Sequence, residues 1–225
     1  MVDDFSMDGT VDIVRRYMAS EKGASIQLLK LNRNRGKGGA IKAGIEFCRG
    51  QYILMADADG ATDVKSIALL YDKHLSTEVY MPIFRGKMGM TIGSRAHLAM
   101  KSIKTRSLIR TVLMKGFHFL VQLLCSSKIK DTQCGFKLFS YRTAIVLFRN
   151  MHIEGWAFDV ELIYTAEILG IPITEIDVNW TEIDGSKLIK NTFDVVITSL
   201  TMARDMFCIH ACYSVGIWSL GYLYF

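Results

Sequence analysis

Residues 52–60 read YILMADADG, an apolar run that ends in two carboxylates one residue apart. The apolar run is typical of a short buried strand, which we expect over residues 51–56. In an open parallel sheet, ligands bind beyond the carboxyl ends of the strands, so Asp57 and Asp59 would project into such a crevice. This pair suits a hard divalent cation that keeps some water and binds a diphosphate. A polar turn whose acids cap the next helix fits the same residues equally well.

Segments with strand and helix patterns alternate on both sides of this stretch. Apolar residues recur with helical spacing over residues 8–18, 39–48, 64–74 and 158–169. Further strands are expected over residues 25–32, 91–94, 134–141 and 174–180. Strands separated by helices of roughly ten residues indicate βαβ units. The predicted fold class is therefore α/β, with a mainly parallel sheet flanked by helices.

The composition bounds the class of protein. The chain has 225 residues, of which 50% are hydrophobic and 22% are charged, so it can bury one sizeable core. Its 2 prolines and 18 glycines exclude a fibrous or Pro/Gly-rich disordered protein. A net charge of +5 does not require nucleic acid, which we do not expect as a partner, but it is compatible with phosphate ligands or an anionic membrane. The 5 cysteines lack C-x-x-C spacing, which argues against a zinc site or a disulfide scaffold.

A second ligand-binding signal lies in the glycine-rich turn of residues 32–39, NRNRGKGG. Glycines permit close backbone approach, the helix that follows offers free N–H groups, and Lys37 adds a cation, so the turn has the ingredients of a phosphate cradle. It lacks the spacing of a Walker loop, and a solvated basic loop is the simpler alternative. Asp4 follows a third strand end, where its carboxylate could meet a nucleobase N–H.

Six motifs occur in one order along the chain: V-D-D-x-S-x-D-G-T, N-R-G-K-G-G-A, D-A-D-G-A-T, G-S-R, D-T-Q-C-G-F-K and W-A-F-D-V-E-L. In this order they resemble family 2 glycosyltransferases with the GT-A fold. The likeness runs from Val2 to about Tyr213, nearly the whole chain. The resemblance implies a Rossmann-like nucleotide-diphospho-sugar transferase.

The resemblance implies donor-binding roles at three motifs. Asp4 would contact the uracil or ribose of UDP-glucose, and Lys37 would line the nucleotide side of the cleft. Asp57 and Asp59 would hold Mg²⁺ or Mn²⁺ on the diphosphate. The cofactor implied is therefore a divalent metal ion.

The resemblance also implies catalytic and acceptor-binding residues. Arg95 would reach the phosphates or the acceptor, and Asp159 lies where related enzymes carry the catalytic carboxylate. The lipid phosphate would be bound by three basic residues, Arg106, Arg110 and Lys115.

The joint run of D-T-Q-C-G-F-K, W-A-F-D and V-N-W-T-E narrows the resemblance to members that glucosylate a lipid phosphate. It implies inverting transfer of glucose from UDP-glucose to dolichyl phosphate at the endoplasmic reticulum membrane, with the catalytic domain facing the cytosol. A phosphate acceptor is already ionised near neutral pH, so Asp159 would orient groups or assist the metal rather than abstract a proton. Two alternatives stay open: mannosyl transfer from GDP-mannose, and a non-catalytic membrane-bound subunit. A dinucleotide oxidoreductase is disfavoured because no G-x-G-x-x-G follows a strand.

Two departures from the family pattern bear on activity. Family members begin upstream with a membrane anchor and a first strand that ends in a P-x-Y-N-E-like turn, so we expect a shortened isoform, active or inert, or a fragment. Phe5 stands where the usual pattern V-D-D-G-S has glycine, a position at which backbone freedom matters.

Two apolar segments are candidates for membrane contact, and the mean hydropathy of +0.22 is high for a freely soluble enzyme. Residues 105–126 are apolar with a few basic residues, which suits amphipathic helices at a membrane interface. Residues 206–225 contain no formally charged residue and would measure about 30 Å if helical, although their Cys, Ser, Gly and His content favours an interfacial or re-entrant tail. We therefore expect a glycosyltransferase domain over residues 1–205 and a membrane-associated tail over 206–225. The alternative is that both segments are core helices of a soluble domain.

Overall fold

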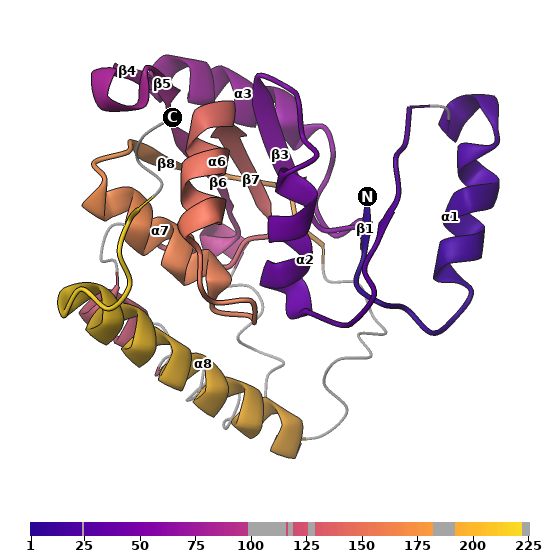
Figure 1. Cartoon of the computed structure of the whole chain (residues 1–225). Helices are drawn as coiled ribbons and strands as arrows, with labels where there is room; N and C mark the ends of the chain where they lie inside the picture. The colour runs from indigo at the N-terminus through magenta and orange to yellow at the C-terminus, as the bar shows by residue number, and fades with distance from the viewer. Residues whose placement is uncertain (24, 99–115, 117–118, 126–128, 182–191, 222–225) are drawn as a thin grey trace.

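A computed structural model describes residues 1–23, 25–98, 116, 119–125, 129–181 and 192–221 (Figure 1). Its strands are β1 (Val2–Asp3), β2 (Leu29–Lys30), β3 (Tyr52–Ala56), β4 (Val79–Met81), β5 (Gly86–Met88), β6 (Met90–Ser94), β7 (Phe136–Ser140) and β8 (Ile173–Asp177). Its α-helices are α1 (Thr10–Met18), α2 (Gly36–Ile45), α3 (Ser66–Thr77), α6 (Tyr141–Asn150), α7 (Phe158–Ile168) and α8 (Thr192–Ser214). Two short 3₁₀ turns are η1 (Glu21–Gly23) and η2 (Pro82–Phe84).

The central sheet has four strands in the order β3-β7-β6-β8. Strand β7 pairs antiparallel with both β3 and β6, whereas β6 and β8 pair in parallel. Strands β3, β6 and β8 therefore run in one direction and β7 runs in the other. The mainly parallel α/β sheet expected from the sequence is confirmed, and the reversed direction of β7 is a feature that the apolar pattern did not reveal.

Two smaller two-stranded sheets flank this centre. Strand β1 pairs in parallel with β2, while β4 and β5 form an antiparallel ribbon. The strand expected over residues 25–32 is reduced to Leu29–Lys30, because β1 offers only Val2 and Asp3 as partners.

Helix α2 begins at Gly36, three residues before the helix expected from the apolar pattern. The apolar periodicity starts only after the glycines, which have low intrinsic helix propensity. Tertiary contacts compensate, because the Asp4 carboxylate accepts the backbone N–H groups of Arg35 (2.7 Å) and Gly36 (2.8 Å) at the start of the helix. The glycine-rich turn is therefore itself the first turn of a helix.

The helices cover both faces of the central sheet (Figure 1). Helices α2, α6 and α7 lie on one face and α3 lies on the other. The main core fills the space between them and includes fully buried residues on several elements, such as Leu70, Ile92, Phe139, Leu147 and Leu162. Helix α6 was not predicted from the sequence, and it contributes much of this core.

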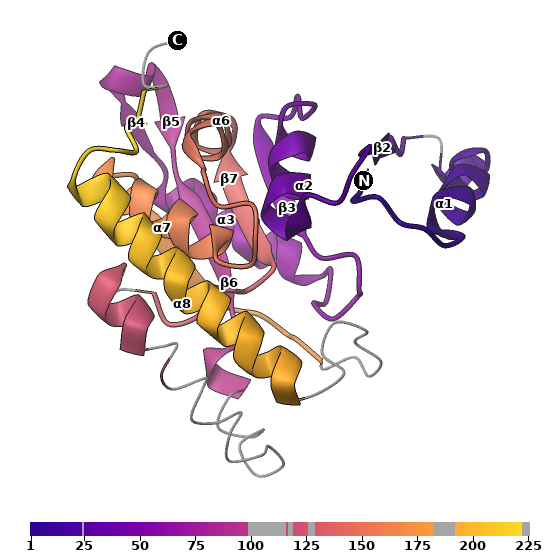
Figure 2. The ribbon, with the colours of Figure 1, turned by 60° about the horizontal axis from the view of Figure 1, so that its bottom comes forward.

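A second apolar cluster joins α7, α8 and residues 119–125 (Figure 2). Met206 and Ile209 of α8 are fully buried in it, against Val121, Cys125 and Val160. Helix α8 runs across the expected boundary between residues 205 and 206, and the division into a domain and a tail stays a prediction. Helix α8 ends at Ser214, and the chain then turns back, with the Trp218 N–H donating to the Cys212 carbonyl at 3.1 Å.

The described helices include none that is long and apolar enough to cross a membrane.

Candidate active site

The carboxyl ends of β3, β6 and β8 and the start of the reversed strand β7 meet at one edge of the sheet. Ala56 pairs with Phe136, and Ser94 pairs with Asp177, which fixes this register. The chain segments that leave these ends carry Asp57, Arg95 and the turn of residues 131–135. The sheet thus gathers three of the six motifs at one edge, as expected for a ligand site of an open α/β sheet.

Lys37 joins the glycine-rich turn to the carboxylate pair. Its ammonium lies 2.8 Å from Oδ1 and 2.9 Å from Oδ2 of Asp57, and 5.8 Å from the centre of the Trp156 ring. The structure thus places the basic turn beside the end of β3, while the donor-binding roles expected of Lys37 and Asp57 stay predictions. Asp57 also faces Gly135, because a Cβ there would stand 2.0 Å from the Asp57 Oδ2 atom. Only glycine allows this approach of the β7 turn to the carboxylate.

Asp4 anchors the glycine-rich turn. Both of its carboxylate oxygens accept backbone N–H groups at the start of α2, and Gly36 has a φ of 79° that favours glycine. The next residue, Phe5, has a φ of 65°, in the left-handed region that a bulky side chain rarely adopts. The departure from glycine noted in the sequence thus falls where backbone freedom matters. The predicted contact between Asp4 and a nucleobase stays a prediction.

Asp59 closes a short turn after β3, with its Oδ1 accepting the Ala61 N–H at 2.9 Å. Asp57 and Asp59 are both exposed. Within the described residues, no group of three or more His, Cys, Asp or Glu side chains is arranged to hold a metal ion. Among the described residues, the end of β3 offers the two carboxylates of Asp57 and Asp59, a donor set that fits Mg²⁺ or Mn²⁺ bound jointly with substrate phosphates and water.

Arg95 forms an ion pair with Asp131, a partner that was not predicted from the sequence. Its Nε and one terminal nitrogen donate to the two Asp131 oxygens at 2.7 and 2.9 Å, and its guanidinium lies 5.5 Å from the centre of the Trp180 ring. Burial lowers the pKa of Arg95, but the Asp131 carboxylate outweighs this effect and the pKa is raised overall. The paired guanidinium is fixed beside the strand end.

Asp159 stands at the start of α7 and is almost fully buried, with 2% of its surface exposed. Its Oδ1 accepts from the Lys137 ammonium at 2.6 Å, and the same ammonium donates to the Cys134 carbonyl at 2.5 Å. Burial raises the pKa of Asp159, and the Lys137 charge opposes this shift. Asp159 also interacts electrostatically with Lys37 and Asp57, so the structure brings this distant residue to the same site.

A groove of about 580 Å³ adjoins the site between β1–β2 and the β3–α2 layer. Its wall is mostly apolar, with Leu29, Ile41 and Met55 among the lining residues, and it reaches Lys37 and Asp57. The three basic residues expected to bind the acceptor phosphate, Arg106, Arg110 and Lys115, lie outside the described residues.

Comparisons with known proteins identify the family. The model of the family described as "Glycosyl transferase family 2" matches residues 1–147. The chain belongs to glycosyl transferase family 2. The GT-A fold class expected from the motifs is confirmed with it.

Curated relatives in this family carry one name. The chain is 48% identical over 221 residues to the dolichyl-phosphate beta-glucosyltransferase of Dictyostelium discoideum and 47% identical over 220 residues to that of Homo sapiens. These alignments cover 98% of this chain but only 64% and 65% of those proteins, so the chain spans less than two thirds of their length.

A solved structure shows the same fold at low identity. Glucosyl-3-phosphoglycerate synthase from Mycobacterium tuberculosis, crystallised with uridine diphosphate, matches with a TM-score of 0.62 at 11% identity. The match covers 93% of this chain and 68% of the synthase.

Four charged residues that pair with groups in or around the candidate site were not assigned from the sequence: Asp131, Lys137, Glu154 and Glu161. The sequence itself indicates that two of these residues are unusual. Lys137 interrupts the apolar strand FKLF, and Asp131 begins the D-T-Q-C-G-F-K motif. A charged residue inside a buried strand requires a partner of opposite charge, which could have directed attention to Asp159.

Proposed function

We propose that the chain transfers glucose from UDP-glucose to dolichyl phosphate with inversion at the sugar. The observation that carries this proposal is the 47–48% identity, over 98% of the chain, to enzymes named dolichyl-phosphate beta-glucosyltransferase. The placement of the Lys37–Asp57 pair beside the glycine-rich start of α2 supports a donor that carries phosphates.

Asp57 and Asp59 would hold Mg²⁺ or Mn²⁺ in this proposal. When bound, the metal would offset the charge of the departing UDP. Lys37 is a cation already paired with Asp57, and its partly exposed ammonium would be free to move to a phosphate oxygen once another cation neutralises that carboxylate. Arg95, fixed by Asp131, would orient the donor phosphates or the acceptor.

The acceptor in this proposal is a lipid phosphate that is already ionised near neutral pH. Asp159 is ill suited to abstract a proton because it is buried and paired with Lys137. A role in orienting the site therefore fits both the acceptor chemistry and the observed ion pair.

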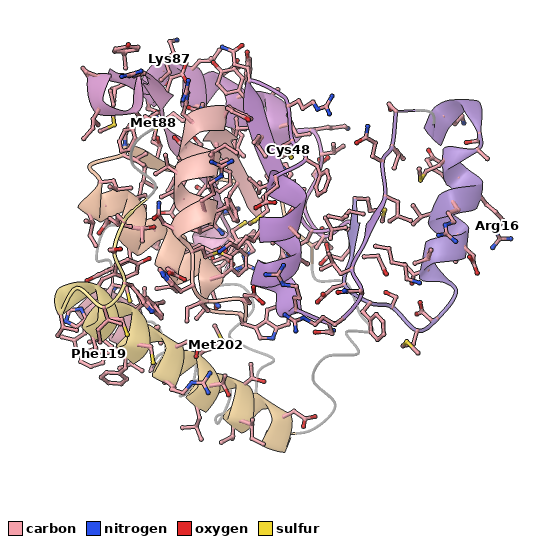
Figure 3. The ribbon with its side chains drawn as sticks, in the orientation of Figure 1. Arg16, Cys48, Lys87, Met88, Phe119 and Met202 are labelled. Atoms are coloured by element: carbon pink, nitrogen blue, oxygen red, sulfur yellow. The ribbon has the colours of Figure 1, made fainter. Side chains whose placement is uncertain are left out.

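A membrane surface is the proposed source of the acceptor. Apolar side chains that are more than half exposed gather on α8, on the turn that follows it and on residues 119–125: Leu200, Phe207, Val215, Ile217, Phe119 and Leu123. Figure 3 shows Phe119 at the outer edge of the molecule beside α8. Such a face suits an interfacial position beside lipid headgroups, with Arg204, which is exposed on α8, among anionic lipids. We propose the cytosolic face of the endoplasmic reticulum as that membrane.

A donor competition assay tests the proposal. The full 225-residue chain is incubated with dolichyl phosphate, Mn²⁺ and either UDP-glucose or GDP-mannose, and the anomeric configuration of the lipid product is determined. Metal-dependent β-glucosyl transfer is expected from UDP-glucose, and none from GDP-mannose. Mannosyl transfer would favour the sister activity. Absence of both transfer and metal-dependent UDP binding would favour the non-catalytic alternative.

A further inference from the structure

A buried network links the end of α8 to the glycine-rich turn. Glu161 on α7 is fully buried, and its carboxylate accepts the backbone N–H groups of His152 (2.9 Å) and Ile153 (2.7 Å). It also accepts the Tyr213 hydroxyl at 2.9 Å. One carboxylate thus connects α7, the segment of residues 151–156 and the last turn of α8.

Aromatic rings close this network on the side of α8. The Trp218 ring stacks on the His152 ring, with centroids 4.4 Å apart and planes within 2°. The Tyr213 ring meets the edges of both, at 5.9 Å from His152 and 5.5 Å from Trp218. The His152 ring is therefore in contact with Tyr213 and Trp218, and its Nδ1 lies 3.1 Å from Glu161 Oε1. We call Tyr213 and Trp218 the aromatic clamp.

The segment of residues 151–156, which the aromatic clamp contacts at His152, packs against the glycine-rich turn. The Glu154 carbonyl accepts the Gly39 N–H at 3.1 Å, and the Glu154 carboxylate forms an ion pair with Arg35. A Cβ at Gly38 would lie 2.9 Å from the carbonyl oxygens of Ile153 and Glu154, so the segment packs directly against the first turn of α2. Lys37 lies on this same turn.

We infer that Tyr213 and Trp218 are positioning residues for the donor side of the site, acting through Glu161 and residues 152–154 on the α2 turn that carries Lys37. The expected effect on catalysis rests on the proposed function. The structural claim, that the clamp holds the α2 turn in place, does not depend on it. Because α8 also presents exposed apolar side chains, the clamp connects the proposed membrane face with the donor site.

Hydrogen exchange tests the structural claim without substrate. Tyr213→Phe removes one hydroxyl and keeps the ring, and Trp218→Ala removes the stack on His152. Both changes should raise the exchange rate of the Gly39 amide, followed by mass spectrometry on peptides that cover residues 34–45, by about threefold to tenfold. Tyr164→Phe is the matched control: the Tyr164 ring lies 5.7 Å from that of Tyr213, but among the described residues its hydroxyl takes no part in the Glu161 network.

Kinetics test the consequence. Both clamp variants should raise KM for UDP-glucose by about threefold to tenfold and leave KM for dolichyl phosphate unchanged. A merely structural role would lower apparent kcat through a smaller folded fraction and leave both KM values unchanged. Unchanged exchange at Gly39 in both variants, or an equal effect in Tyr164→Phe, would overturn the inference. If the wild-type chain showed no glucosyl transfer, the proposed function would be refuted. The hydrogen-exchange result at Gly39 would still decide whether Tyr213 and Trp218 position the glycine-rich turn.

Discussion

Two lysine–aspartate pairs in the site have nearly equal lengths and different surroundings. Lys37 and Asp57 lie 2.8 Å apart with side chains 21% and 38% exposed. Lys137 and Asp159 lie 2.6 Å apart with side chains 0% and 3% exposed. The first pair joins a helix turn to a strand end, and the second joins β7 to α7 inside the protein.

This difference in burial divides the two pairs by role. Water reaches and screens the partly exposed pair Lys37–Asp57, which we therefore expect to contribute little to stability and to exchange partners when a ligand binds. The buried pair has lost its hydration, so each charge depends on the other and neither is free to leave. Distance alone would make the pairs look equivalent. Under the proposed function, we therefore expect Lys37–Asp57 to be the working pair, which binds ligand, and Lys137–Asp159 to be the supporting pair, which holds the site in place.

Removing the buried cation should have the largest effect. Lys137→Met leaves the Asp159 charge without its partner in the core, and we expect the free energy of unfolding to fall by about 3–5 kcal/mol. Urea denaturation measures this change. Adding Asp159→Leu in the same chain should restore most of the loss, because an apolar pair of similar volume replaces the ion pair. A loss below about 1 kcal/mol for Lys137→Met would show that the pair is not desolvated.

Neutralising the aspartate of each pair should lower the turnover rate by different amounts. We expect Asp57→Asn to lower glucosyl transfer by about 100-fold, or about 2.7 kcal/mol in the barrier, because it removes a charge that the metal would bind. Asp159→Asn should cost less, about tenfold, if Asp159 orients groups rather than reacting. Steady-state rates with UDP-glucose, and circular dichroism to check folding, make the comparison. Near-normal turnover in Asp57→Asn would remove that residue from the metal site.

His74 is a buried titratable residue that can be compared with the buried Lys137–Asp159 pair. His74 is fully buried at the opposite end of the sheet, with its ring nitrogens 3.0 Å from the Thr91 hydroxyl and 2.9 Å from the Ser140 hydroxyl. Burial lowers the pKa of His74, although Glu78 nearby opposes the shift. The unfolded chain therefore binds a proton here at a higher pH than the folded chain does.

Stability should consequently fall as the pH drops below about 6.5, the unfolded value for histidine, with a slope of at most about 1.4 kcal/mol per pH unit from this residue. Urea denaturation between pH 7.5 and 5.5 measures the slope. His74→Gln should be less stable than wild type at pH 7.5 and should show a shallower slope. Equal slopes in the two proteins would assign the pH dependence to other groups.

The strand end at Asp57 and the glycine-rich turn at Lys37 were predictable because each is encoded locally. An apolar run that stops at acidic residues, and glycines that precede a helical pattern, need no knowledge of the fold. The partners of Arg95 and Asp159 were not predictable in this way. They depend on β7 inserting between β3 and β6 in the reverse direction, which brings Asp131 and Lys137 to the site. Strand order is a long-range property that local periodicity does not contain.

The C-terminal region shows the same limit. Residues 206–225 are uncharged apart from His210, and this composition fits a membrane segment and a buried helix equally well. The contact with Val121 and Val160 decides that Met206 and Ile209 pack in the protein. Composition identified the apolar segment correctly but could not assign which of its side chains face inward.

Replacing the exposed cation should have the smallest effect on stability. Lys37→Gln keeps most of the side-chain length and removes the charge, and we expect the free energy of unfolding to change by less than about 1 kcal/mol. Binding of UDP with Mn²⁺, measured by calorimetry, should weaken several-fold, because a phosphate-binding cation is lost. Lys87→Gln is the matched control, since Lys87 also pairs with a carboxylate at 2.8 Å, that of Glu78, but away from the site. If Lys37→Gln destabilised the chain as much as Lys137→Met, or if both glutamine variants bound UDP equally well, the assignment of Lys37–Asp57 as the working pair would fail.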